Sequence, residues 1–141
     1  MMIVQVCMRQ EEGYCSIRHS TQSATSFVMS NLGNAVATAG NAGSTACYLD
    51  FIGIPGGSAD GNSPTYDRFC GTYLAAHLAA SATSAPQAII SKNTGLVFHF
   101  KFYLISLGKS TPFEVAVKTD GTTTTGATPI GAGLKYQLLP C

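Results

Sequence analysis

Cysteine side chains are the most reactive groups in the sequence, and two of them border one conspicuous segment. Cys47 and Cys70 stand at the ends of the stretch CYLDFIGIPGGSADGNSPTYDRFC. If they are bonded, the bridge closes a long loop and stabilises the fold by roughly 2–4 kcal/mol in the chain-entropy model. The alternative is a pair of free, buried thiols. We expect the bridge, which is typical of proteins from an oxidising, extracellular compartment.

The other three cysteines leave the pairing open, because five is an odd number and one thiol remains over in a secreted protein. Cys7 and Cys15 flank residues 9–13, which can form a hairpin, so a bridge between them is sterically reasonable. Cys141 is then unpaired here, with its partner upstream of this sequence. Alternatively, Cys141 pairs with Cys7 and leaves Cys15 free. The expected bridge is Cys7 to Cys15.

The three histidines, His19, His77 and His99, give no catalytic or metal-binding pattern. None has a carboxylate or a cysteine at ligand spacing, and the HExxH, GxSxG, P-loop and dinucleotide motifs are absent. A hydrolase with a reactive cysteine beside a histidine would need a free thiol, whereas every cysteine but one fits a disulfide better. We therefore expect a protein that is not an enzyme.

Short strands must position these residues. Apolar side chains fall on both faces of an extended segment at 48–54, which indicates a strand covered on both sides. Pro55-Gly56-Gly57 should end that strand, because proline donates no ladder hydrogen bond and glycine favours turns. Further strands are predicted at 1–6, at 26–30 and, from strict alternation, at 95–108. The small polar residues that follow the expected strand at 26–30 predict a surface loop up to about Thr45. Residues 73–80 fit a loop or a short helix.

Composition independently supports one β-rich domain. A chain of 141 residues can enclose a single core, and 45% hydrophobic residues exclude disorder. Charged residues make up 11%, against a usual value of about 25%, and the net charge is +1, so no field attracts nucleic acid. The apolar run at 95–108 is shorter than the about 18–20 residues of a membrane span and carries His99 and Lys101.

Several blocks of sequence occur in an order and spacing typical of a known family. They are Arg9–Ile17, the Cys-x-x-Asp of Cys47–Asp50, the Ile-x-Ile-Pro-Gly-Gly of Ile52–Gly57, Asp67–Gly71, Thr111–Asp120 and Gly133–Cys141. Together they resemble the CUB domain in its arthropod variety, as the C-terminal module of secreted proteins with two CUB-like domains. The resemblance covers most of the chain. It implies an all-β fold, an antiparallel jelly-roll-type β-sandwich stapled by disulfides, over residues 1–141.

The same resemblance bears on the start of the chain and on one internal segment. The family pattern passes almost directly from Ser91-Lys92 to Thr111, so residues 95–108 are expected to be an insertion, either an extra hairpin or a translated intron. A CUB domain also has another strand region and a cysteine before this start. Because Met1–Val6 has no signal-peptide features, we expect a truncated N-terminus.

Some CUB domains bind calcium through a glutamate, the aspartate of Cys-x-x-Asp and an aspartate in a later loop. By this resemblance Asp50 and Asp120 match the second and third ligands, and carboxylates suit calcium, which takes several oxygen ligands. The position of the glutamate is occupied by Ser30, so the implied site is weaker or absent. The alternative is that Asp50 is hydrogen-bonded at a strand end and Asp120 lies in a turn.

We expect an extracellular, non-catalytic binding module of CUB type, with no membrane span, that recognises a protein or carbohydrate ligand through its loops. The expected binding residues are Tyr48, Asp50, Asp67, Arg68 and Asp120. Asp67 and Arg68 can instead form a local salt bridge. Two further functions stay open: a regulatory or substrate-recognition domain of a larger secreted protease-type protein, and a structural component of the extracellular matrix.

Overall fold

The computed structural model describes residues 2–9, 11–29, 40–62, 64–77, 86–92, 113–119 and 131–141, to which all structural statements below refer. This part of the chain contains strands and no helix. The strands are β1 (Met2–Met8), β2 (Tyr14–Thr21), β3 (Phe27–Val28), β4 (Gly40–Ala42), β5 (Phe51–Ser58), β6 (Tyr66–Gly71), β7 (Ile89–Lys92), β8 (Phe113–Thr119), β9 (Gly131–Ala132) and β10 (Leu134–Pro140).

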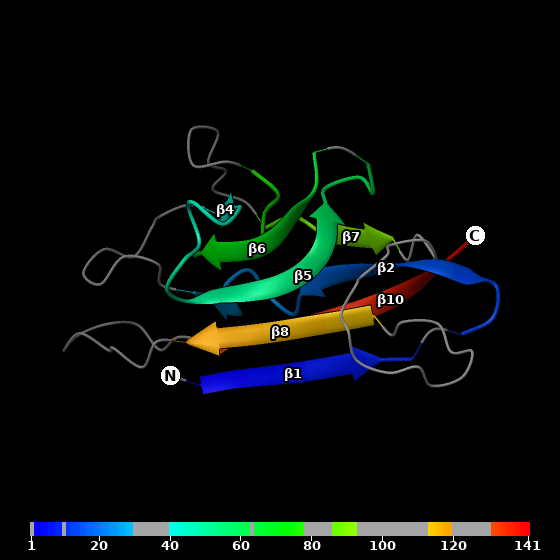
Figure 1. The fold of residues 1–141 in the computed structure, drawn as a ribbon, viewed down its shortest axis with the longest axis horizontal. Helices are drawn as coiled ribbons and strands as arrows, with labels where there is room; N and C mark the ends of the chain where they lie inside the picture. Colours follow the sequence, from blue (N-terminus) through cyan, green and yellow to red (C-terminus); the bar gives the residue numbers. More distant parts are fainter. Residues whose placement is uncertain are drawn as a thin grey trace, which may run out of the picture.

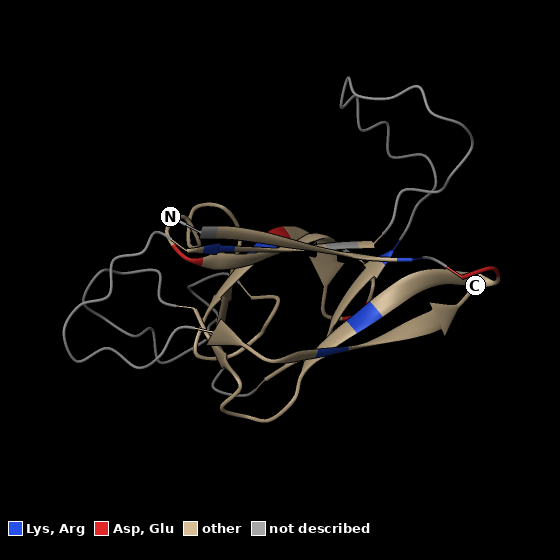
Figure 2. Ribbon diagram, turned by 90° about the horizontal axis from the view of Figure 1, so that it is seen from below, with Lys and Arg blue, Asp and Glu red and all other residues tan. Residues whose placement is uncertain are grey.

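One curled antiparallel sheet makes up most of the fold. Its strands follow the path β1-β8-β5-β7-β2-β10, while β6 pairs with β5 and β4 pairs with β6. The short strands β3 and β9 form a separate pair. The sheet folds over into two layers, with β1, β8 and β5 in one and β2 and β10 in the other (Figures 1 and 2). The predicted fold class, an all-β antiparallel sandwich with disulfides, is confirmed.

β5 carries the sheet from one layer to the other. Its first residues pair with β8, where Phe51 lies opposite Lys118, and its last residues pair with β7, where Gly57 lies opposite Ser91. The register with β6 shifts between Gly53 and Gly57. A strand that bends at such a bulge can turn a corner between two layers.

The prediction that Pro55-Gly56-Gly57 ends the strand is therefore wrong. Pro55 is exposed and lies within the irregular stretch, where a missing N–H costs no ladder hydrogen bond, and Gly56 has a φ of 62°. Gly57 is required by packing, because a Cβ there would lie 2.6 Å from Ile89 Cγ2 and 2.8 Å from Phe69 Cζ.

The core lies between the two layers. Its fully buried apolar side chains include Ile17, Phe27, Met29, Ile52, Ile54, Phe69, Leu74 and Ile89. The expected strand at 26–30 is present in part, as β3 and an isolated bridge from Met29 to Gly71.

The surface loop expected up to Thr45 is wrong at Gly40–Ala42, which forms β4 and pairs with β6. A Cβ at Gly40 would lie 2.5 Å from the Tyr73 carbonyl oxygen, so the small residues allow close approach there. Residues 73–77 form a loop, and the predicted strand at 95–108 lies outside the described residues.

Two disulfides join the strands, and one of them differs from the expected pairing. Cys47 bonds to Cys70, as predicted. Cys15 bonds to Cys141, with a Cα–Cα distance of 4.9 Å, and Cys7 is free and exposed. The predicted Cys7–Cys15 bridge and the unpaired Cys141 are therefore wrong.

The reason lies in the connection from β1 to β2, which is not a hairpin. β1 pairs with β8, whereas β2 pairs with β10 and β7, so Cys7 and Cys15 belong to different layers. The antiparallel pairing of β2 with β10 brings the end of the chain next to Cys15, where Pro140 lies opposite Tyr14.

Candidate functional site

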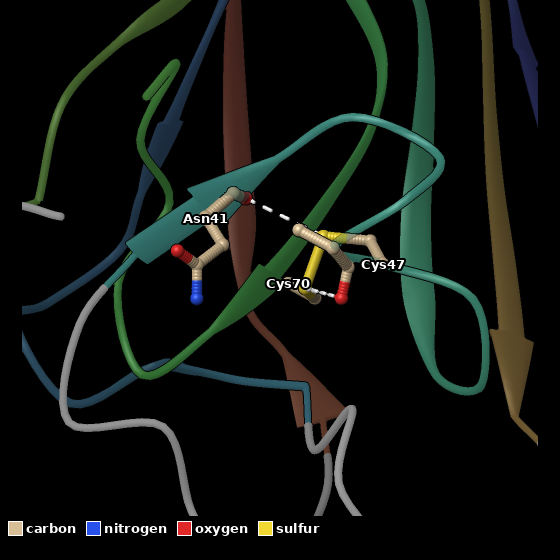
Figure 3. Close-up of a disulfide and its surroundings, with 4 residues drawn as sticks. Asn41, Cys47 and Cys70 are labelled. Atoms are coloured by element: carbon tan, nitrogen blue, oxygen red, sulfur yellow. Dashed lines mark hydrogen bonds between the residues drawn. A yellow bond between two sulfur atoms is a disulfide. The ribbon is translucent and has the colours of Figure 1, made fainter. Parts of the chain in front are cut away.

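A disulfide fixes the loop that precedes β5. Cys47 and Cys70 are fully buried, and their bond ties the loop to the end of strand β6 (Figure 3). The Asn41 carbonyl oxygen lies 3.6 Å from Cys47 Sγ, which places β4 against the same bridge. Tyr48, the next residue in the chain, has 49% of its surface exposed. The bridge therefore holds an exposed tyrosine on an anchored loop.

Two cationic side chains converge on the ring of Phe51, the first residue of β5. Arg68 Cζ lies 4.6 Å from the centroid of the ring, and Lys118 Nζ lies 5.4 Å from it. Both distances are within the range of cation–π attraction, which is about 6 Å. Lys118 Nζ also donates a hydrogen bond of 3.3 Å to the Tyr48 carbonyl oxygen. We call Tyr48, Phe51, Arg68 and Lys118 the cation-aromatic surface.

Strand pairing explains why these residues meet. Phe51 lies opposite Lys118 on β8, and Gly53 lies opposite both Ala116 on β8 and Arg68 on β6. Residues opposite one another on paired strands point to the same face, while the alternating residues Ile52 and Val117 face the core. Phe51 therefore shares the outer face of the sheet with both cations, together with the small residues Gly53 and Ala116.

The positive charge of the cation-aromatic surface is not neutralised within the described part of the chain. The salt bridge found there joins Arg9 to Glu11, at 4.0 Å, on a different segment. Asp67 is next to Arg68 in sequence, but its Oδ1 accepts a 2.8 Å hydrogen bond from the Gly56 N–H, which links β6 to β5. The surface therefore offers two cations to an incoming anionic group.

The expected binding residues separate into three groups. Tyr48 and Arg68 belong to the cation-aromatic surface. Asp67 is exposed and accepts a hydrogen bond from the Gly56 N–H in the bulge of β5, while Asp50 is 2% exposed and so is turned away from bulk solvent. Asp120, like the serine at position 30 where the calcium-binding glutamate was expected, lies outside the described residues.

Phe51 and Lys118 were not identified from the sequence. The alternation of Val-Ala-Val-Lys at 115–118 does place Lys118 on the face opposite the core. The register that sets it beside Phe51 is a tertiary property, which a single sequence does not specify.

The described histidines are not arranged for metal binding or catalysis. His77 Nε2 lies 3.0 Å from the side-chain amide nitrogen of Gln87. His19 is 1% exposed, its Nε2 has no hydrogen-bond partner, and burial lowers its pKa from 6.5 to about 4. The described residues contain no group of three or more His, Cys, Asp or Glu side chains that could hold a metal ion. In the same residues, no helix has the length and apolar character needed to cross a bilayer.

The fold is that of a disulfide-stapled β-sandwich, with the cation-aromatic surface on a loop and on the outer face of the sheet. A family model described as the animal CUB domain matches residues 2–139. The chain therefore belongs to the CUB domain family. Comparison with curated proteins gives no match, and neither does comparison with solved structures. CUB domains are generally non-catalytic binding modules and are typically extracellular, which agrees with the two disulfides.

Proposed function

We propose that this protein is an extracellular, non-catalytic binding module that recognises a protein or carbohydrate ligand through its cation-aromatic surface. The observation that carries the proposal is the pair of cations, Arg68 and Lys118, at the ring of Phe51, neither of which forms a salt bridge with another described residue. Membership of the CUB family supports a binding role and an extracellular location.

The arrangement favours a ligand with an anionic group. The Arg68 guanidinium is positioned on an aromatic ring, so less side-chain entropy is lost when it binds a carboxylate or a sulfate. Arg and Tyr are also the residues that most often dominate protein interfaces. Tyr48 lies beside the cations on the disulfide-anchored loop, and its exposed ring can contact the rest of the ligand.

The test is a binding screen of the folded protein against secreted proteins and glycans, followed by affinity measurements on each hit. The double variant Arg68→Gln/Lys118→Gln should weaken binding at least about tenfold, because a hydrogen bond to a charged group contributes about 1.5–3 kcal/mol. Affinity for the unmodified protein should also fall with added salt.

The matched control is Arg18→Gln/Lys135→Gln, which removes the same charge from exposed positions on β2 and β10. It should leave affinity unchanged. Equal loss of affinity in both double variants would show that binding depends on net charge and not on this surface. No loss of affinity in either would place the binding site elsewhere on the molecule.

A second proposal concerns calcium. Asp50 is nearly fully buried on the loop next to the cation-aromatic surface, at the aspartate position of the Cys-x-x-Asp segment. We propose that Asp50 and Asp120 supply carboxylate oxygens to a weak calcium site in which Ser30 replaces an acidic ligand. Asp50 is the one of these three positions that the described residues include, so the proposal rests on its burial and on the CUB resemblance.

A further inference from the structure

Among the described strands, β1 lies at an edge of the sheet and lacks the charge, proline and bulge that usually protect an edge. It is the terminal strand on the path of the sheet, and its seven residues pair with β8 without any register shift. It has no charged residue and no proline, and Ile3, Val4 and Val6 are 61%, 42% and 50% exposed. Natural edge strands are normally short, charged, bulged or covered, because unpaired N–H and C=O groups recruit another strand.

The opposite edge shows the contrast within the same molecule. β10 carries Lys135, and its register with β2 shifts between Leu139 and Pro140. The disulfide from Cys141 to Cys15 also ties down its end. β10 is therefore protected by a charge, a bulge and a proline, while β1 has none of them.

The sequence of β1 is close to a palindrome centred on Gln5. Met-Ile-Val-Gln-Val-Cys-Met has methionine at both ends, valine on both sides of Gln5, and an apolar isoleucine and a cysteine at the equivalent positions between. In an antiparallel pair around a two-fold axis through Gln5, Val4 would lie opposite Val6 and Ile3 opposite Cys7 of the other copy. A two-fold interface must be complementary to itself, and the near-palindromic sequence of β1 meets this requirement.

We infer that β1 pairs with β1 of a second copy, antiparallel and centred on Gln5, to form one continuous sheet across a homodimer. The exposed valines would then lie against each other on the core side of the sheet, since Val4 and Val6 are opposite Val117 and Val115 of β8. On the outer face, the two Gln5 amides meet at the axis and can hydrogen-bond to each other. Apolar cross-strand pairs of this kind stabilise a sheet, and the shared edge pairs its backbone hydrogen bonds.

The pairing has a consequence for the cation-aromatic surface. The axis is perpendicular to the sheet, so both copies of this surface would point to the same side. Five strand spacings separate one β5 from the other, which is about 24 Å at about 4.8 Å each. The dimer itself does not depend on the proposed ligand. With the proposed binding role of the cation-aromatic surface, it gives a binding face with two equivalent sites.

The first test measures the mass of the 1–141 chain by light scattering and by sedimentation over a range of concentrations. We expect a dimer. Val4→Lys/Val6→Lys sets lysine against lysine in both symmetry-related pairs and should weaken the dimer at least about tenfold, because like charges opposite each other are unfavourable. Val4→Lys/Val6→Glu sets lysine against glutamate only in the register centred on Gln5 and should restore the dimer.

The control for the first test is Tyr136→Lys on β10, which adds a charge to an exposed residue of the other edge and should leave the dimer intact. A thermal melt of each variant checks that the sandwich still folds. A chain that is monomeric at every concentration, or a dimer that persists in Val4→Lys/Val6→Lys, would overturn the inference.

The second test maps the register by oxidation with oxidised glutathione in a Cys7→Ser background. Gln5→Cys should form a disulfide-linked dimer, since position 5 lies opposite itself, whereas Ile3→Cys should not. In the unmodified dimer the two Cys7 residues would be about 14 Å apart along the strands, too far for a disulfide. Cross-linking at position 3 or at Cys7 instead of position 5 would refute the proposed register.

Discussion

The buried histidine on β2 makes stability depend on pH in a way that can be calculated. His19 lies opposite Tyr136 of β10 and Ile89 of β7, is 1% exposed, and has no hydrogen-bond partner for Nε2. Burial disfavours the charged imidazolium and lowers its pKa to about 4. In the unfolded chain the same side chain regains its ordinary pKa of about 6.5.

The sign of the effect follows from proton binding. Between pH 6.5 and about 4 the unfolded state binds a proton at His19 that the folded state does not, so stability falls as the pH falls. Above pH 6.5 the contribution of His19 to the free energy of unfolding is constant, and below about pH 4 this residue causes no further loss of stability. A difference of about 2.5 pKa units corresponds to a loss of about 3 kcal/mol, a large fraction of the stability of a small domain.

The assay is urea unfolding at pH 7 and pH 4, followed by tyrosine fluorescence, since the chain has no tryptophan. His19→Leu removes the titration and the unpaired nitrogen while keeping similar bulk. At pH 7 its free energy of unfolding should be within about 1 kcal/mol of the unmodified protein, and at pH 4 it should exceed it by about 3 kcal/mol. Ile89→Val serves as a control that lowers stability by about 0.5–1.5 kcal/mol at both pH values. If the free energies of the unmodified protein and His19→Leu fall in parallel, His19 does not titrate as its burial requires.

Two further predictions concern packing and metal binding. Gly57→Ala should lower the free energy of unfolding by about 1–3 kcal/mol, because its Cβ would overlap two core side chains. In the same urea titration, Gly131→Ala should change it by less than about 0.5 kcal/mol, since its Cβ would have open space, and equal effects would contradict the packing argument. Millimolar calcium, but not magnesium, should raise the melting temperature, and Asp50→Asn should abolish the rise. An identical melt with and without calcium would exclude the calcium proposal.

Local sequence patterns were sufficient for a β-rich domain, and the resemblance to CUB domains supplied the sandwich, but neither supplied all the connections. The Cys47–Cys70 bridge was predicted correctly because it spans a short segment of the chain. The Cys15–Cys141 bridge joins residues 126 positions apart and depends on which strands become neighbours. That choice is made by the packing of the whole sheet, because connections between its two layers carry no local signal.

The Pro-Gly-Gly segment is a case in which a clear local signal gives the wrong structure. Its residue types predict a turn, which is the commonest outcome. In the folded chain the bulge bends β5 without ending it, and Gly57 allows the β7 side chain Ile89 to approach. The proline and glycines that predict the end of a strand are here the residues that allow β5 to bend from one layer to the other.

The bend in β5 also determines what the outer face can do. Before the bulge, β5 lies between β8 and β6, which brings Lys118 and Arg68 to either side of Phe51. β1 follows β8 directly, so the unprotected edge begins two strands from this ring. A surface with two cations supplies only modest affinity by itself, but two copies on one rigid sheet can gain about 10²–10⁴ in avidity on a repetitive ligand. If both proposals hold, dimerisation through β1 would make a weak site effective on a ligand with repeated anionic groups, and Val4→Lys/Val6→Lys would lose that gain while keeping the monomer's intrinsic affinity.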